Sequence, residues 1–362
     1  LVWAKDFGCI WDERTMAMAA RAGEHGPFLS RCPDGTWTTT DAARNAHIDV
    51  LRWARDNRCP WDERTCSSAA SGGHLEVLCW ARANGCPWDE HTCSEAAQGG
   101  HLDTLKWARA NGCPWDHITC SAAAEGGHLE ILQWARVSDC PWSEETCDWA
   151  VRAGQLEVLR WVVAAGCPVS QESVCMGAAM SGQLEVLKWA RVVQGYPWDE
   201  SICALAAAGG HLDILRWARI NGCPWDEETC TGAAEAGHVE VLAWARANAC
   251  PWDCDTCFAA ARGGHLEVIE WAWANGGRWD EDICSEAAQW GHLRVLQWAR
   301  ANGCPWDELT CSNAARWGHL EVLKWARANG CPWNLDTWEA VIDGGHHHIM
   351  TWGTLNGLPH PI

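Results

Sequence analysis

Apolar positions recur along the chain with the spacing of an amphipathic helix, and the same pattern returns every 27 or 28 residues. In residues 318–333, which read GHLEVLKWARANGCPW, the side chains of Leu320, Leu323 and Ala326 fall on one helical face, and Trp325 widens that face. The Asn-Gly pair that follows is typical of a helix end. This stretch therefore predicts one amphipathic helix in each repeat.

A second helix is predicted after each turn. In the unit that reads GCPWDEETCTGAA, Asp226 is a candidate N-cap, Glu227 lies in the first turn, and Gly237 ends the helix. This second helix is predicted to be the shorter one, and its face consists of small residues. No segment of the chain has the alternation that is typical of a strand.

A Gly-His junction sets the period of the repeats. The junction position is held by His47, His74, His101, His128, Gln155, Gln183, His211, His238, His265, His292, His319 and His346. Residues 47–345 are therefore predicted to be regular repeats, residues 1–46 partial or degenerate units, and residues 346–362 a partial unit. A single hairpin cannot bury its apolar face, whereas stacked copies can. The sequence thus predicts one all-α solenoid over residues 1–362.

The charge and the apolar content change what the solenoid is expected to bind. The formal net charge is −20, from 47 acidic and 27 basic residues, and 48% of the residues are hydrophobic. Nucleic-acid binding proteins normally carry the opposite sign of charge, so the sequence predicts no nucleic-acid partner. No apolar run is long enough to span a membrane. Leu1 falls inside a repeat, so we expect that residues precede it.

Twenty-three cysteines raise the question of a metal site, a disulfide or a structural role. Each unit offers a pair seven residues apart, such as Cys223 and Cys230, with His238 further on. A zinc site usually has two cysteines that are closer together in the sequence. In the repeats that depart from the common pattern, packing residues replace the cysteines and glutamine replaces the histidine. A disulfide within each unit remains an alternative. The favoured interpretation is a small buried hydrophobe in a reducing environment, with no metal and no cofactor.

Two columns of tryptophan also follow the period. One column includes Trp80 and Trp107, and the other includes Trp88 and Trp115. An ultraviolet-absorbing array is conceivable, but spacing inside a core pattern favours packing. We therefore predict that Trp107→Ala costs roughly 3–5 kcal/mol of stability.

The repeat resembles the ankyrin family at residues 91–116, HTCSEAAQGGHLDTLKWARANGCPWD, and most closely at the recurring AAxxGHLEVL motif. The resemblance implies a helix–turn–helix solenoid that binds partners and has no catalytic activity. Two departures stand out: the unit is about six residues shorter than the usual ankyrin repeat, at the place of its β-hairpin fingertip, and the Thr-Pro-Leu-His tetrad is missing. Without fingertips, binding is expected on the concave face of the shorter helices.

Comparison of the units with one another separates constant positions from variable ones. The variable positions lie on the shorter helix, just before the junction, and are expected to face outward. Tryptophan replaces a small residue there at Trp290 and Trp317, in consecutive units, and exposed indoles are typical interface anchors. The candidate partner-binding residues are Trp149, Arg152, Phe258, Arg262, Gln289, Trp290, Arg316 and Trp317.

Two functional classes follow from these observations. The first is a non-enzymatic scaffold that binds a protein partner, and the alternative is a structural linker in a large assembly, for which Trp273 on the longer helix is an indication. No nucleophile–base pair or phosphate-binding loop stands outside the repeat, so no catalytic residue is predicted. The free thiols favour an intracellular, reducing compartment, cytoplasm or nucleus, and leave an organelle open.

Overall fold

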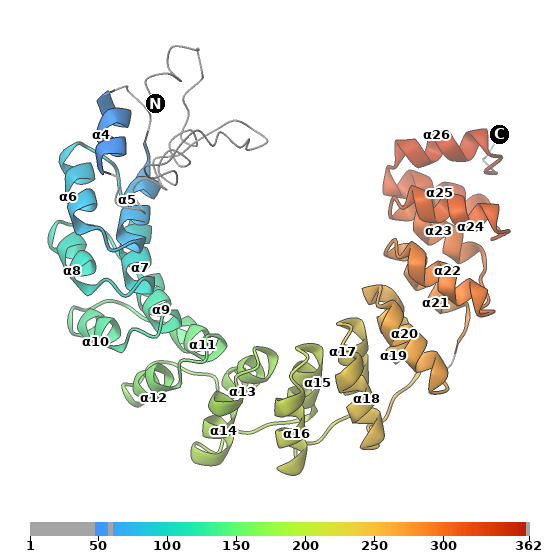
Figure 1. The fold of residues 1–362 in the computed structure, drawn as a ribbon, viewed down its shortest axis with the longest axis horizontal. Coiled ribbons are helices and arrows are strands. Elements are labelled where there is room, and N and C mark those ends of the chain that lie inside the picture. The colour runs from blue at the N-terminus through green and yellow to red at the C-terminus, as the bar shows by residue number, and fades with distance from the viewer. Residues whose placement is uncertain (1–47, 57–60, 278, 360–362) are drawn as a thin grey trace. The chain divides into compact units, whose positions relative to one another are not determined.

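The structure, a computed structural model, describes residues 48–56, 61–277 and 279–359, and all regular structure in these ranges is helical (Figure 1). The partial units predicted in residues 1–46 lie outside the described residues. Within the described ranges there is no strand, and each repeat is a hairpin of two helices. The predicted all-α class and helical-repeat solenoid are therefore confirmed.

The chain divides into two compact units, residues 1–177 and 178–362, which are described here one at a time. That the whole chain forms one array stays a prediction. In both units the odd-numbered helices carry the Ala-Ala pair and the even-numbered helices carry the Leu and Trp positions. The helices of the first unit are α4 (Ile48–Asp56), α5 (Glu63–Ser71), α6 (Leu75–Ala83), α7 (Glu90–Gln98), α8 (Leu102–Ala110), α9 (His117–Glu125), α10 (Leu129–Val137), α11 (Glu144–Arg152) and α12 (Leu156–Ala164).

The division between the units falls within α13 (Gln171–Met180). The second unit continues the same alternation of hairpins. Its helices are α14 (Leu184–Lys188), the π-helical turn η1 (Trp189–Val193), α15 (Glu200–Ala208), α16 (Leu212–Ile220), α17 (Glu227–Glu235), α18 (Val239–Ala247), α19 (Cys254–Gly263), α20 (Leu266–Ala274), α21 (Glu281–Gln289), α22 (Leu293–Ala301), α23 (Glu308–Arg316), α24 (Leu320–Ala328), α25 (Leu335–Gly344) and α26 (His347–Leu355).

The odd-numbered helix of a repeat is as long as the even-numbered one or longer, which corrects the prediction of a shorter second helix. In the repeat that contains α7 and α8, both helices have nine residues. The small side chains of the odd-numbered helices had suggested a short element, but these side chains reflect tight packing against the neighbours. Partner binding was expected on one face of the helices that had been predicted to be shorter. These are the odd-numbered helices, and that face is called the odd-helix face from here on.

Most odd-numbered helices start at an aspartate, as the sequence predicts, whereas α11 starts at Ser143 and α25 at Asn334. The side chain of Asp89 accepts a hydrogen bond from the backbone N–H of His91 at 3.2 Å, and the same contact recurs at most units. Asp226 occupies the N-cap position, but its side chain makes no capping bond. The helices end at glycine-containing turns, where Gly100 adopts a φ of +80°.

The repeats stack side by side along each unit. In the first unit α5, α7, α9 and α11 contact one another in order, and in the second unit α15 through α25 do the same (Figure 1). Ala96, Ala97 and Leu105 have no exposed surface, and the equivalent residues of other repeats are buried as well. The core of each unit therefore lies between a layer of odd-numbered and a layer of even-numbered helices.

The tryptophans and arginines form a joint between consecutive even-numbered helices. The Arg109 guanidinium lies 4.2 Å from the centroid of the Trp115 ring and donates a hydrogen bond to the carbonyl of Cys113. Trp115 in turn meets the edge of Trp134, with ring centroids 5.6 Å apart. The joint recurs with the arginines Arg82, Arg136, Arg219, Arg246, Arg300 and Arg327.

The exceptions show that the joint works as a unit. Where the loop tryptophan is replaced by Val169, the arginine is replaced as well, by Val163. Where the arginine is replaced by Trp273, its ring packs against Trp279 at 5.0 Å and Trp298 at 6.5 Å. Trp273 on α20 therefore has a packing role inside the second unit.

One of the two single-residue insertions is absorbed by a change in helix type. In the second unit the extra residue falls after α14, and the chain forms the π-helical turn η1 there. Arg191 still reaches its usual partners, since it donates to the carbonyl of Tyr196 at 2.9 Å and lies 4.6 Å from the Trp198 ring. The joint is thus kept despite the insertion.

Candidate partner-binding surface

The two indoles singled out in the sequence are exposed in the second unit. Trp290 and Trp317 occupy the C-cap positions of α21 and α23, and 50% and 56% of their surface is accessible. These helices contact each other directly. The C-cap position explains the exposure, because it lies beyond the buried Ala-Ala pair of each helix. Trp290 and Trp317 thus place two accessible aromatic side chains on neighbouring odd-numbered helices.

The arginines beside them are engaged within the chain. The Arg262 Nε lies 3.4 Å from a carboxylate oxygen of Glu235, and Arg316 Nη2 lies 3.3 Å from a carboxylate oxygen of Asp343. In both pairs the partner is at the same position of an adjacent repeat, 27 residues away. Both arginines were candidate partner-binding residues, and in the structure their guanidinium groups are paired with carboxylates of the chain itself.

Gln289 and Phe258 lie on the same layer of helices. Gln289 is half-buried at the end of α21, directly before Trp290. Phe258 is half-buried on α19 and lines a pocket of about 360 Å³ that is bounded by α17, α19 and α21. Its other side chains include Arg262 and the carboxylates of Glu228, Glu235, Asp255 and Glu286. We call this the α17–α21 pocket.

Trp149 and Arg152 belong to the first unit, so they form a separate candidate surface. Trp149 on α11 is 39% exposed, and the Arg152 guanidinium lies 5.7 Å from its ring centroid. Partial burial raises the pKa of the adjacent Asp148, while the charge of Arg152 opposes that shift. Of the eight candidate residues, the structure brings six together on odd-numbered helices of the second unit and two on α11.

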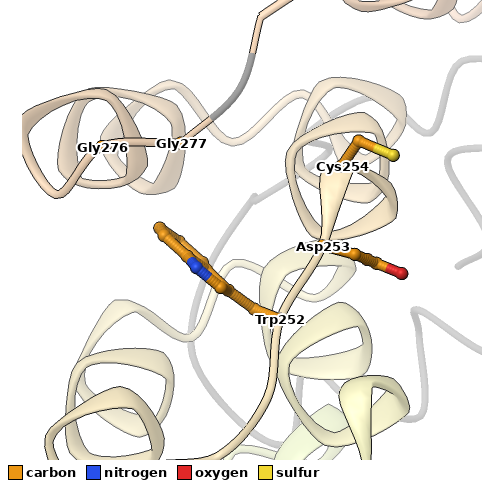
Figure 2. A pocket seen from close by; sticks show the side chains of 5 residues that line it. All are labelled: Trp252, Asp253, Cys254, Gly276 and Gly277. Carbon is orange, nitrogen blue, oxygen red and sulfur yellow. The ribbon is translucent and has the colours of Figure 1, made fainter.

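A second cavity, of about 410 Å³, lies at the joint after α20 and is lined by Trp252, Asp253, Cys254, Gly276 and Gly277. Figure 2 shows the Trp252 indole directed toward the Gly276–Gly277 turn, whereas the Cys254 and Asp253 side chains point away from it. Gly277 stands where most repeats have a cysteine. A side chain at Gly277 would instead point toward Cys257 Sγ and the Ala272 carbonyl, 3.0 Å from its Cβ, and the polar groups of the cavity do not converge on a common point.

The junction histidines have a role that the sequence pattern did not predict. Nε2 of His101 is 3.0 Å from the carbonyl oxygen of Ser71, and Nε2 of His128 is 2.9 Å from that of Gln98. Each histidine thus reaches the end of the odd-numbered helix of the preceding repeat, α5 for His101 and α7 for His128. Gln155 makes the same contact through its amide, which donates to the carbonyl of Glu125 at 3.3 Å. The replacement of histidine by glutamine at Gln155 and Gln183 was the feature of the sequence that could have indicated this contact, because both side chains supply an N–H donor.

The histidine contacts predict a pH dependence of stability. Burial lowers the pKa of His319, and the neighbouring His292 and His346 lower it further. The unfolded chain then binds the proton more readily than the folded one, so stability is full above a pH of about 6.5 and falls as the pH drops below that value, toward the lower pKa of the folded state. Urea titrations between about pH 8 and pH 5 should show this decline.

The control for that prediction is His319→Gln, the same exchange that the chain carries at Gln155. It should keep most of the stability at pH 8 and show a smaller decline toward pH 5. An equally steep decline in the variant would mean that His319 does not contribute.

The described cysteines of the two repeat positions are buried, as the sequence predicts, whereas Cys79 and Cys254, which lie outside these positions, are partly exposed. Cys93 and Cys113 have no exposed surface, and their thiols interact across a separation of twenty residues rather than seven. The Cys93 thiol donates a hydrogen bond to Cys113, and this bond together with burial raises the pKa of Cys93. At Cys257, burial and nearby Cys254 and Asp280 raise the pKa to about 11. The raised pKa keeps the Cys93 and Cys257 thiols protonated at neutral pH, whereas the hydrogen bond from Cys93 lowers the pKa of Cys113.

The cysteines of the described ranges are free thiols, and in these ranges no three His, Cys, Asp or Glu side chains are grouped as a metal site. The histidines 346–348 at the start of α26 include a ring pair, His346 and His348, with centroids 5.8 Å apart. No helix of the described residues has the length and apolar character needed to cross a membrane.

Comparison with known proteins gives similarity in structure only. No known protein family matches the sequence, and no curated protein matches it either. Among solved structures the chain is similar to the pentatricopeptide repeat protein PPR10 in complex with an 18-nt psaJ RNA element, and to a cysteine-to-serine variant of the same complex. In both cases the identity is 13%, the TM-score is 0.37, and 98% of this chain is covered.

The chain spans 66%, just under two thirds, of the length of those two proteins. At this TM-score neither an activity nor a partner carries over. The comparison does correct one prediction. The prediction of no nucleic-acid partner, which rested on the net charge of −20, is withdrawn, because both similar structures are complexes with RNA.

Proposed function

We propose that the chain is a non-enzymatic, ankyrin-like repeat scaffold that binds a protein partner on the odd-helix face of its second unit. The exposure of Trp290 and Trp317 is the observation that supports this most strongly. Both occupy positions where other repeats have glycine, alanine or serine, and the fold has no need of an indole there. Large accessible aromatic groups on a rigid scaffold are typical of interface anchors.

The ankyrin-like assignment is supported by the hairpin itself. The AAxxGHLEVL motif spans the end of an odd-numbered helix, the glycine turn and the start of an even-numbered helix, in the order of the ankyrin pattern. The turn after each even-numbered helix leads directly to the next odd-numbered helix, with no β-hairpin in the described residues. Binding must then rely on the helices themselves.

The structural-linker alternative has weaker support. It relied on an aromatic residue, Trp273, that replaces the usual arginine on an even-numbered helix. The contacts of Trp273 with Trp279 and Trp298 account for this replacement within the chain. The alternative remains as an outcome of the binding experiment, in which many co-purifying neighbours would favour it.

The test is affinity capture from an extract of the source organism with the native chain and with the double variant Trp290→Ala/Trp317→Ala. Recovery of the partner should fall at least tenfold with the double variant, because each anchor at an interface is worth about 2 kcal/mol or more. Ile220→Ala is the matched control, since Ile220 is an exposed apolar residue at the end of α16. Equal recovery with the double variant and the control would contradict the proposal.

A further inference from the structure

We propose that the α17–α21 pocket binds an arginine or lysine side chain presented by a protein partner. The inference rests on the function proposed above and specifies the chemistry of the partner. The pocket has an aromatic ring, an excess of carboxylates and a volume of about 360 Å³ in one place on the odd-helix face. That volume lies at the small end of the range of ligand pockets and suits a single side chain.

The charge balance sets the sign of the ligand. The pocket holds the carboxylates of Glu228, Glu235, Asp255 and Glu286 and one cation, Arg262. Arg262 is already paired with Glu235 at 3.4 Å, which leaves three carboxylates without a cation in the pocket. The three helices together carry seven acidic residues and one arginine. A cation entering this pocket is therefore attracted both by its walls and by the surrounding face.

Phe258 adds a second recognition element. An aromatic ring attracts a cation to its face and also packs against the methylene groups of an arginine or lysine stem. Trp149 in the first unit lies one position closer to its junction residue than Phe258 does, and the chain's own Arg152 lies 5.7 Å from its ring centroid. Among the residues that the structure describes, no arginine is stacked on Phe258 in that way, so the ring is available to a partner.

The pocket adjoins the proposed anchors. Glu286 lines the pocket, and Trp290 follows it by four residues, which is one helical turn along α21. One extended segment can therefore place a basic side chain in the pocket and apolar groups against Trp290. A basic and apolar peptide segment is the partner that this combination fits.

The test uses two blocked pentapeptides, one with a central arginine between glycines and one with citrulline, the uncharged analogue of arginine. Calorimetric titration of the full chain should show at least tenfold tighter binding of the arginine peptide. Glu228→Gln/Glu286→Gln should remove that preference, and the matched variant Glu240→Gln/Glu267→Gln, with exposed carboxylates on α18 and α20, should keep it. Equal loss in both double variants would overturn the inference, because general charge would then explain the binding.

The variant Arg262→Gln should change the affinity for the arginine peptide in the opposite direction, toward tighter binding, which a folding defect would not produce. Removing the competing cation should tighten binding of the arginine peptide about threefold or more, and unchanged or weaker binding would contradict the proposal. A single-stranded RNA oligomer that bound more tightly to Glu228→Gln/Glu286→Gln than to the matched variant Glu240→Gln/Glu267→Gln would also overturn it, by assigning this face to nucleic acid.

The outcomes separate this inference from the proposed function. A captured partner that depends on Trp290 and Trp317, together with no preference for arginine over citrulline, would refute the pocket and leave the surface in place. Arginine binding that depends on the pocket, without any partner that depends on the two indoles, would support the pocket and refute the indole anchors.

Discussion

Gly100→Ala is expected to lower the free energy of unfolding of the first unit by about 2–5 kcal/mol. Two effects add at this position. The φ of +80° is a left-handed conformation that costs an alanine about 1–2 kcal/mol. A methyl group would also lie 2.6 Å from the His128 ring, and relief of such overpacking costs about 1–3 kcal/mol more.

Gly112→Ala is the matched control, because Gly112 has a φ of +84° and no atom lies within 4 Å of the added methyl group. It should show only the conformational cost. His128→Ala in the Gly100→Ala background should recover the steric part by removing the ring. Urea denaturation measures all four chains, and equal losses for Gly100→Ala and Gly112→Ala would refute the packing of the histidine against the glycine turn.

Trp107→Ala is expected to cost about 2–3 kcal/mol, less than the sequence alone predicted. The ring is half-buried rather than fully buried, so the loss of transfer free energy is smaller. Its edge-on contact with Trp88, at 6.0 Å between centroids, adds about 0.5–1.5 kcal/mol to that loss. Since each repeat contacts only its neighbours, the loss should be largest in the repeats on either side.

Trp107→Phe keeps an aromatic ring at the joint and should lose about half as much stability. Hydrogen exchange in the two variants locates the loss, with faster exchange expected in α6, α8 and α10. An unchanged urea midpoint for Trp107→Ala would show that the tryptophan column does not hold the repeats together.

The repeat period and both helices of each hairpin could be predicted because they depend on local patterns. The Leu, Ala and Gly positions are read from the sequence with helical spacing, as in α24, which was expected from Leu320, Leu323 and Ala326. The relative lengths of the helices could not be predicted in the same way. Small residues in an odd-numbered helix reflect contacts between neighbouring repeats, which the sequence of one repeat does not reveal.

Some contacts between repeats can be recognised in the sequence, but only when equivalent positions of different repeats are compared with one another. The simultaneous loss of arginine and tryptophan at Val163 and Val169 points to the cation–π joint. The opposite charges of Glu235 and Arg262, one period apart, point to their ion pair. By contrast, the pairing of Cys93 with Cys113 depends on how successive repeats stack, and the period alone does not specify it.

The candidate surface was predicted in part. Its location on the odd-numbered helices was expected from the variable positions, whereas the sequence left the exposure of Trp290 and Trp317 open. The engagement of Arg262 and Arg316 by neighbouring carboxylates was not foreseen, nor was the acidic pocket beside Phe258. Both arise from side chains of different repeats that meet only when the repeats are stacked.

Hydroxyl-radical footprinting of the chain alone and in the captured complex tests the central claim most directly. Trp290 and Trp317 should be oxidised readily in the free chain and protected at least fivefold in the complex. Trp273, which is 43% exposed on α20, should react equally in both states. Protection of Trp273 with continued oxidation of Trp290 and Trp317 would place the partner on the even-numbered helices and contradict the account.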